Sequence, residues 1–152
     1  MNWARSIASG CGCGYAPVAP GTVASAIAAV TGAGLASVSP WLLAAAALAA
    51  TLGGFWAVKE AKADGDPGWI VIDEFAGQWI ALLGLGSRGI TVLSVAGAFL
   101  LFRIFDIWKP GPVGWADRWH TPAGVMADDV IAGAMAACVV LGSLWLWPVL
   151  PR

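Results

Sequence analysis

Charged side chains are scarce in this sequence. Asp, Glu, Lys and Arg make up 11% of its 152 residues, whereas a soluble domain averages about 25%. Together with 59% hydrophobic residues and a mean hydropathy of +0.78, this scarcity excludes an ordinary soluble domain and predicts an integral membrane protein. The net charge of −1 gives no positive field for nucleic acid, so we expect no nucleic-acid partner.

Histidine and cysteine are rare as well, and their rarity excludes several kinds of catalysis. His120 is the single histidine, so a mechanism that needs a nucleophilic histidine and a second histidine is excluded. Arg stands six positions after none of the three cysteines, which excludes a thiolate nucleophile in a Cys-x5-Arg loop. A zinc site would need more histidine or cysteine ligands. The glycine-rich residues 10–21 lack the Gly-Lys-Ser/Thr of a P-loop.

Tryptophan, glycine and alanine, in contrast, are abundant. The ten Trp residues favour the boundary between hydrocarbon and water, where the ring is buried and the N–H stays hydrated. The 20 Gly residues and the many Ala residues are small enough to let transmembrane helices approach closely. We therefore predict an all-α, integral membrane helical bundle that forms a single domain over residues 1–152.

Apolar stretches of the sequence predict four to five membrane segments. They lie at residues 23–36, 41–58, 69–86, 90–107 and 128–147, and longer polar loops occupy 59–68 and 108–127. A spanning helix needs about 20 residues, so the first segment either crosses where the bilayer is thin or is re-entrant. Thr22 precedes this segment and is expected to cap its helix.

Lysine and arginine are distributed unequally between the two expected sides of the membrane. If five segments alternate from a cytoplasmic N-terminus, the cytoplasmic side collects Arg5, Lys59, Lys62, Lys109 and Arg118, and the far side keeps Arg88 and Arg152. Cytoplasmic loops of membrane proteins carry an excess of Lys and Arg. The distribution therefore predicts a cytoplasmic N-terminus and a C-terminus on the far side.

Two adjacent pairs of acidic residues stand at the starts of expected segments. They are Asp73-Glu74 and Asp128-Asp129. An ionised carboxylate in an apolar environment is costly unless a cation meets it. Mg²⁺ takes oxygen ligands, so we predict that acids from two helix starts hold one or two such ions. The alternative is helix capping, because acidic side chains also stabilise helix N-termini through the helix dipole.

Basic residues follow in the segment Phe102 to Pro110. Arg103 and Asp106 are three positions apart and share a helix face, so they either pair with each other or bind a ligand. The planar guanidinium of Arg suits phosphate, and Lys109 adds a compact charge. With a cytoplasmic N-terminus, residues 19–22, 73–74, 103–109 and 128–129 all fall at cytoplasmic helix ends. This convergence predicts a site for an anionic substrate bridged by metal.

Four stretches of the sequence resemble the phosphatidylglycerophosphatase A family of bacterial membrane lipid phosphatases. They are Gly-Tyr-Ala-Pro-Val-Ala-Pro-Gly-Thr (14–22), Ile-Val-Ile-Asp-Glu-Phe-Ala-Gly (70–77), Phe-Arg-Ile-Phe-Asp-Ile-Trp-Lys-Pro-Gly-Pro (102–112) and Gly-Val-Met-Ala-Asp-Asp-Val-Ile-Ala-Gly (124–133). They keep the order of the family's motifs and span most of the chain. Ala24, Ala26 and residues 121–123 depart from the family pattern, which affects the shape of loops more than the chemistry.

The resemblance implies Mg²⁺-dependent hydrolysis of phosphatidylglycerol phosphate to phosphatidylglycerol and phosphate, a step of glycerophospholipid biosynthesis. It places the protein in the bacterial cytoplasmic (inner) membrane as a multi-pass protein whose site faces the cytoplasm. The matching motifs imply that Asp73, Glu74, Asp128 and Asp129 are catalytic, that these four and Asp106 bind the metal, and that Thr22, Arg103 and Lys109 bind the substrate. Either water or an aspartyl nucleophile fits this set, and no single carboxylate stands out as the base.

Two other classes of protein also have a few polar residues in apolar helices. A small transporter or channel would line a path with carboxylates throughout the membrane depth. A structural subunit would use its polar residues only to hold helices together, and would tolerate conservative changes at Lys109 or Asp128. The gathering of charge at one expected side of the membrane favours the enzyme over the transporter.

Overall fold

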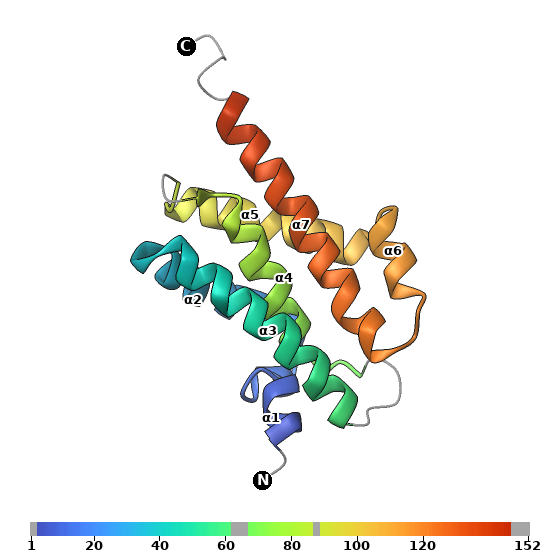
Figure 1. The fold of residues 1–152 in the computed structure, drawn as a ribbon. Helices are drawn as coiled ribbons and strands as arrows, with labels where there is room; N and C mark the ends of the chain where they lie inside the picture. The colour runs from blue at the N-terminus through green and yellow to red at the C-terminus, as the bar shows by residue number, and fades with distance from the viewer. Residues whose placement is uncertain (1–2, 62–66, 87–88, 147–152) are drawn as a thin grey trace.

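The computed structural model describes residues 3–61, 67–86 and 89–146, and within these ranges the chain is all-helical, without a β-strand. The elements in order are α1 (Trp3–Ala8), the short 3-10 turn η1 (Cys13–Tyr15), α2 (Pro20–Val38), α3 (Pro40–Ala61), α4 (Ile72–Leu83), α5 (Val92–Trp108), α6 (Pro112–Asp117) and α7 (Pro122–Leu146). Figure 1 shows them as one helical bundle. The predicted all-α fold is confirmed.

Three of these helices, α2, α3 and α7, are long and apolar enough to cross a membrane, with 19, 22 and 25 residues. The first expected segment, residues 23–36, therefore lies inside a continuous helix of spanning length. α5 has 17 residues and is slightly shorter. α4 has 12 residues, or about 18 Å at ~1.5 Å per residue, which is shorter than the ~30 Å hydrocarbon core.

The short helix α4 lies at the centre of the bundle and packs against α2, α3, α5 and α7. Ala76, Ala81 and Leu82 of α4 are fully buried. The indole N–H of Trp79 donates to the carbonyl oxygen of Ala28 in α2 at 2.9 Å. Because protein surrounds α4 on several sides, the chain can leave the helix after Leu83 without placing open backbone against lipid.

Helices α4 and α7 approach each other closely, and two glycines make this approach possible. A Cβ added to Gly133 would overlap the carbonyl oxygen of Gly77, and a Cβ on Gly77 would lie 2.6 Å from the carbonyl oxygen of Asp129. Further along both helices, a Cβ on Gly84 would lie 2.5 Å from the carbonyl oxygen of Ala137. The two helices therefore run in the same direction and nearly touch through their backbones, as small residues allow in membranes.

Prolines begin four of the helices, and this corrects several expected boundaries. α2 begins at Pro20 with Ala19 as its N-cap, so Thr22 is the third helical residue and the prediction of a Thr22 cap is wrong. α7 begins at Pro122, and the hydroxyl of Thr121 accepts from the backbone N–H of Gly124 at 3.1 Å. Pro suits the first helical turn because its fixed φ matches the helix and its missing N–H would have no partner there.

The prolines also explain why the expected loop at 108–127 contains regular structure. Pro112 starts the six-residue helix α6, and α7 begins well before the expected start at Asp128. Asp128 and Asp129 therefore lie in the second turn of a helix and not at its start. Asp73 and Glu74 do lie in the first turn of α4, as expected.

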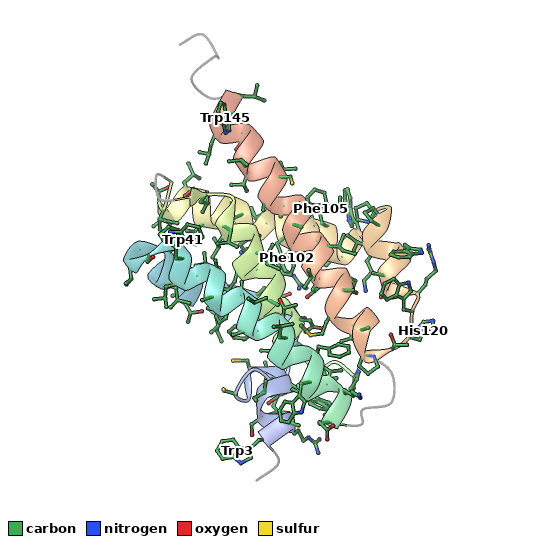
Figure 2. All side chains as sticks on the ribbon, in the orientation of Figure 1. Trp3, Trp41, Phe102, Phe105, His120 and Trp145 are labelled. Atoms are coloured by element: carbon green, nitrogen blue, oxygen red, sulfur yellow. The ribbon has the colours of Figure 1, made fainter. Side chains whose placement is uncertain are left out.

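The outer surface of the bundle is apolar and carries tryptophans at its ends. Trp41 at the start of α3 and Trp145 near the end of α7 are 83% and 75% exposed; in Figure 2 Trp41 lies at the left and Trp145 near the top. Trp108, Trp115 and Trp119 are exposed near the opposite helix ends. Such rings suit the membrane–water boundary, and together with the three spanning helices they identify a membrane protein.

Charged residues in the described part of the chain gather at one end of the bundle, where α2, α4 and α7 begin and α3 and α5 end. This one-sided distribution disfavours a transporter, whose charges would line a path through the membrane. Lys62, Arg88 and Arg152, which entered the prediction of orientation, lie outside the described residues.

One polar residue of α4 lies deep in this apolar bundle. Gln78 is fully buried, and neither its amide nitrogen nor its carbonyl oxygen has a hydrogen-bond partner among the described residues. An unsatisfied buried polar group costs about 1–3 kcal/mol. Met has a similar length without these groups, so we expect Gln78→Met to raise the thermal unfolding midpoint in detergent. A lower midpoint, close to that of Gln78→Glu, would contradict this explanation.

Candidate active site

The polar helix ends enclose a cavity of about 230 Å³. This volume is large enough for several water molecules. Its lining combines the start of α2, the start of α4, the end of α5 and the second turn of α7. The charged residues that line it are Asp73, Glu74, Arg103, Asp106, Lys109, Asp128 and Asp129. The structure therefore brings together every predicted catalytic and metal-binding residue.

Two ion pairs use four of these charged groups. Arg103 Nη1 lies 2.5 Å from Asp106 Oδ2, so the pairing of these two residues, one of the two expected alternatives, is present. Lys109 Nζ donates to Asp128 Oδ2 at 2.8 Å and also contacts Asp117 of α6. Partial burial lowers the pKa of Lys109, but its bonds to Asp117 and Asp128 outweigh burial and hold the pKa above its usual range.

The other three carboxylates of the cavity belong to Asp73, Glu74 and Asp129, and each offers an oxygen within 4.8 Å of the others. Glu74 Oε2 and Asp129 Oδ2 are buried without a hydrogen-bond partner among the described residues. Two oxygens on opposite sides of one Mg²⁺ are about 4.2 Å apart, since each bond is ~2.1 Å. The three acids therefore fit a divalent cation after small adjustments of their side chains.

The count of charges in the cavity leads to the same conclusion. Five carboxylates and two basic groups line it, which leaves three more negative than positive groups when all are ionised. Buried like charges repel strongly, and a cavity with this excess would also repel an anionic ligand. A bound divalent cation would remove most of the excess and make the cavity suitable for an anion.

Arg103 is the basic residue with the most contacts in the cavity. Besides Asp106, its guanidinium donates to the hydroxyl of Ser25 at 3.3 Å and to the hydroxyl of Thr22 at 3.5 Å. Its Nε–H is buried without an acceptor among the described residues. A guanidinium held in place by hydroxyl groups from α2, with one donor still available, is prepared to bind an oxyanion.

Gly21 explains how α2 approaches the acids so closely. A Cβ at this position would overlap Glu74 Oε1, so Glu74 lies directly against the first turn of α2. Both Pro20 and Gly21 line the cavity. The start of a helix carries a partial positive charge and favours anions, so this backbone adds to the attraction of Arg103 for a phosphate group.

Thr22, Arg103 and Lys109, the predicted substrate-binding residues, are all near the acids, although Thr22 reaches the site only through Arg103. The sequence interpretation missed Ser25, Asp117 and the crossing glycines Gly77 and Gly133. The glycines had a signal in the sequence, because each stands four positions after an acid of the cavity, in Asp73-x-x-Ala-Gly77 and Asp129-x-x-Ala-Gly133. His120 lies in an exposed position before α7 and is not part of the cavity lining.

Known proteins resemble this chain over most of its length. The sequence matches the profile of the family described as phosphatidylglycerophosphatase A over residues 6–144. It is 38% identical over 146 residues to phosphatidylglycerophosphatase A of Escherichia coli (strain K12), and the match covers 93% of this chain and 84% of that protein.

Two further relatives extend the comparison. The chain is 35% identical over 147 residues to a provisionally named phosphatidylinositol-3-phosphatase of Bacteroides thetaiotaomicron, and the match covers 92% of each protein. It is 40% identical over 83 residues to phosphatidylglycerophosphatase A of Haemophilus influenzae, with 54% of this chain and 49% of that protein covered. No solved structure matches the chain.

Proposed function

The chain belongs to the phosphatidylglycerophosphatase A family and is therefore a phosphatase, and we propose that it uses Mg²⁺ to hydrolyse phosphatidylglycerol phosphate. The products are phosphatidylglycerol and inorganic phosphate. The observation that carries this proposal is the group of three acids, Asp73, Glu74 and Asp129, whose oxygens lie within 4.8 Å of one another beside Arg103. Such a group needs a cation, and an oxygen-only set of ligands suits Mg²⁺.

In this proposal each charged group of the cavity has a separate task. Asp73, Glu74 and Asp129 hold the metal, with Asp106 and Asp128 as further acids of the same cavity. Bound Mg²⁺ supplies Lewis-acid polarisation of a phosphoryl oxygen and lowers the pKa of water. Arg103 binds the phosphate through its available Nε–H, and Ser25 and Thr22 fix the plane of the guanidinium. Lys109 offsets the negative charge that develops on the phosphoryl oxygens.

The reaction then needs a water, a proton acceptor and a leaving group. The oxygen of water attacks phosphorus in line with the ester oxygen, and the bond between phosphorus and that ester oxygen breaks. A carboxylate of the cavity accepts the proton of the water. The glycerol oxygen leaves and takes up a proton, which gives the free hydroxyl of the lipid product. The excess of acids around the phosphate position supplies the acceptor without a histidine.

The location of the cavity supports a lipid substrate. It lies at one end of the helical bundle, beside the spanning helices α2 and α7, so a headgroup can enter it while the acyl chains stay in the bilayer. We place this end on the cytoplasmic face of the bacterial inner membrane, because Arg5, Lys59, Lys109 and Arg118 lie at the same end and cytoplasmic loops are rich in Lys and Arg.

A metal and substrate panel tests the proposal with purified protein in detergent. We expect phosphate release from phosphatidylglycerol phosphate to fall below about 1% after chelation and to return with Mg²⁺, because the three acids alone would repel the substrate. Phosphatidylinositol 3-phosphate and phosphatidic acid serve as competing substrates. Full turnover in excess chelator would contradict the role of the metal, and faster turnover of another lipid phosphate would change the assigned substrate.

A further inference from the structure

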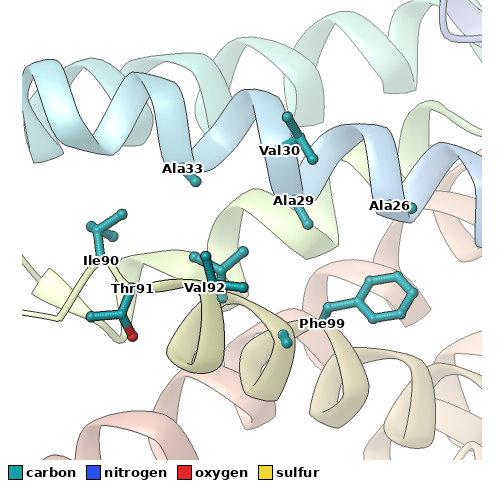
Figure 3. A pocket seen from close by; sticks show the side chains of 10 residues that line it. Ala26, Ala29, Val30, Ala33, Ile90, Thr91, Val92 and Phe99 are labelled. Carbon is teal, nitrogen blue, oxygen red and sulfur yellow. The ribbon is translucent and has the colours of Figure 1, made fainter.

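An apolar groove of about 490 Å³ runs between α2 and α5. Figure 3 shows Ala26, Ala29 and Ala33 of α2 on one side, and Val92 and Phe99 of α5 on the other. The alanines are three and four positions apart, so they share one face of α2. Because these side chains are small, the two helices leave a space where larger residues would have met.

The groove begins within one helical turn of the candidate active site. Ala26 follows Ser25, whose hydroxyl accepts from Arg103, and Phe99 lies four positions before Arg103 on the same face of α5. Both walls of the groove are therefore continuations of the helices that hold the guanidinium. In phosphatidylglycerol phosphate a glycerol and a phosphodiester separate the terminal phosphate from the acyl chains, so with that phosphate at Arg103 an acyl chain enters the groove beyond this polar part.

The lining of the groove selects the chemistry of its occupant. Its one polar side chain, among the residues that line it, is Thr91, and the Thr91 hydroxyl is already bonded to Ser94 as the cap of α5. The groove offers nothing for a sugar, an amide or a charged headgroup to bind. From Ala26 to Ala33 it follows α2 for about 11 Å, at ~1.5 Å per residue, which suits a linear hydrocarbon.

The groove is also open to the side. Val30 and Val92 at its rim are 74% and 90% exposed, and α2 is long and apolar enough to span a membrane. A chain that is already in the bilayer can therefore enter sideways without passing through water. Because lipid tails are as apolar as the groove, its contribution lies in positioning the molecule more than in a gain of hydrophobic free energy.

We propose that this groove holds one acyl chain of the lipid whose phosphate binds in the acidic cavity. The proposal rests on the proposed phosphatase function, since it takes the phosphate position as one anchor of the substrate. With the terminal phosphate at Arg103 and one acyl chain between α2 and α5, the lipid is held at two points, which limits the movement of the headgroup between them. A misplacement of about 1 Å at the reacting atom can cost about 100-fold in rate, so this second anchor would increase turnover.

The first experiment fills the groove. Ala33→Phe places a ring in its far half, and Ala45→Phe makes the same change at an exposed position of α3 away from the groove. Phosphate release is measured in mixed micelles from substrates with the same headgroup and either six-carbon or sixteen-carbon chains. We expect Ala33→Phe to lower the ratio of kcat/KM for long chains over short chains by about tenfold, and Ala45→Phe to leave this ratio as in the wild type.

The second experiment detects the chain directly. A lipid phosphate with a photoreactive diazirine midway along one acyl chain is cross-linked to the wild-type protein, and the labelled peptides are identified by mass spectrometry. We expect labels within residues 26–33 and 92–99, and their loss in Ala33→Phe. Equal labelling of the outer faces of α3 and α7, cross-links to a second copy of this chain, or an unchanged chain-length ratio would overturn the proposal.

The two experiments separate the groove from the function on which it rests. If the wild-type protein releases no phosphate from any lipid phosphate, the phosphatase function fails, whereas the cross-linking pattern still reports on the groove. If turnover is normal but the chain-length ratio of Ala33→Phe matches that of Ala45→Phe, the function stands and the groove assignment is wrong.

Discussion

Asp129→Asn is expected to reduce phosphate release on the order of 10³-fold while the protein still folds and inserts. The substitution keeps the shape of the side chain and removes its charge. Asp129 is almost completely buried, and its Oδ2 has no hydrogen-bond partner among the described residues. No other cavity group replaces it, because Asp106 and Asp128 are already paired with Arg103 and Lys109.

The measurement combines turnover with metal binding. Phosphate release is followed across a range of Mg²⁺ concentrations, and metal affinity is measured separately by the rise in thermal midpoint on adding Mg²⁺, since a ligand that binds only the folded state stabilises it. Glu60→Gln is the matched control, because Glu60 is an exposed acid at the end of α3 outside the cavity. Turnover of Asp129→Asn at the rate of Glu60→Gln, with an unchanged metal response, would remove Asp129 from the metal site.

The acids of this site were predictable because charge is so rare in the sequence. With nine Asp and Glu residues in the whole chain, two adjacent pairs in apolar surroundings stand out, and the cost of burying them predicts a cation. The all-α membrane fold followed from the same scarcity. The convergence of the helix ends followed from counting alternating segments, and a three-dimensional structure was not needed to place these residues at one end of the bundle.

The sequence did not predict that Asp128 and Asp129 would have different partners. Neighbouring residues of an α-helix point about 100° apart, so the two acids of this pair are able to face different partners. Asp129 turns toward α4 and its acids, whereas Asp128 turns toward Lys109. This division depends on where α7 begins, and the sequence interpretation placed that start six residues too late, at the first of the two acids.

The start of α7 was predicted too late for a physical reason that also applies to other helices of the chain. Apolar residues set the expected start of each helix, but backbone geometry decides the first turn. Thr121-Pro122 supplies a capping hydroxyl and a proline with suitable φ, so the helix starts in polar sequence. The same reasoning would have found α6 at Pro112, and with it Asp117 as the second partner of Lys109.

Gly133→Ala is expected to destabilise the protein, which is the opposite of the usual effect of Gly to Ala within a helix. Gly to Ala within a helix normally stabilises by up to about 1 kcal/mol. Here the added Cβ would overlap the carbonyl oxygen of Gly77, and a backbone atom cannot move aside by changing a rotamer. The helices α4 and α7 must separate, at a cost of about 1–3 kcal/mol for overpacking, so we expect a lower thermal midpoint.

We expect Gly133→Ala to reduce turnover more strongly than it reduces stability. Asp129 lies one turn before Gly133 on α7, and Asp73 lies one turn before Gly77 on α4, so the glycine crossing sets the distance between the two acids. A separation of about 1 Å at the crossing is expected to lower turnover on the order of 100-fold and to weaken the Mg²⁺ response, because one ion can no longer bind both acids at ~2.1 Å.

Gly142→Ala gives the matched control, since a Cβ added to Gly142 of the same helix meets nothing within 4 Å. There the usual stabilisation should appear and turnover should not change. Both variants are compared by thermal unfolding in detergent and by phosphate release. If Gly133→Ala behaves like Gly142→Ala in both measurements, the two helices do not approach through their backbones. The acids would then owe their positions to some other contact, and the close crossing would not be what builds the site.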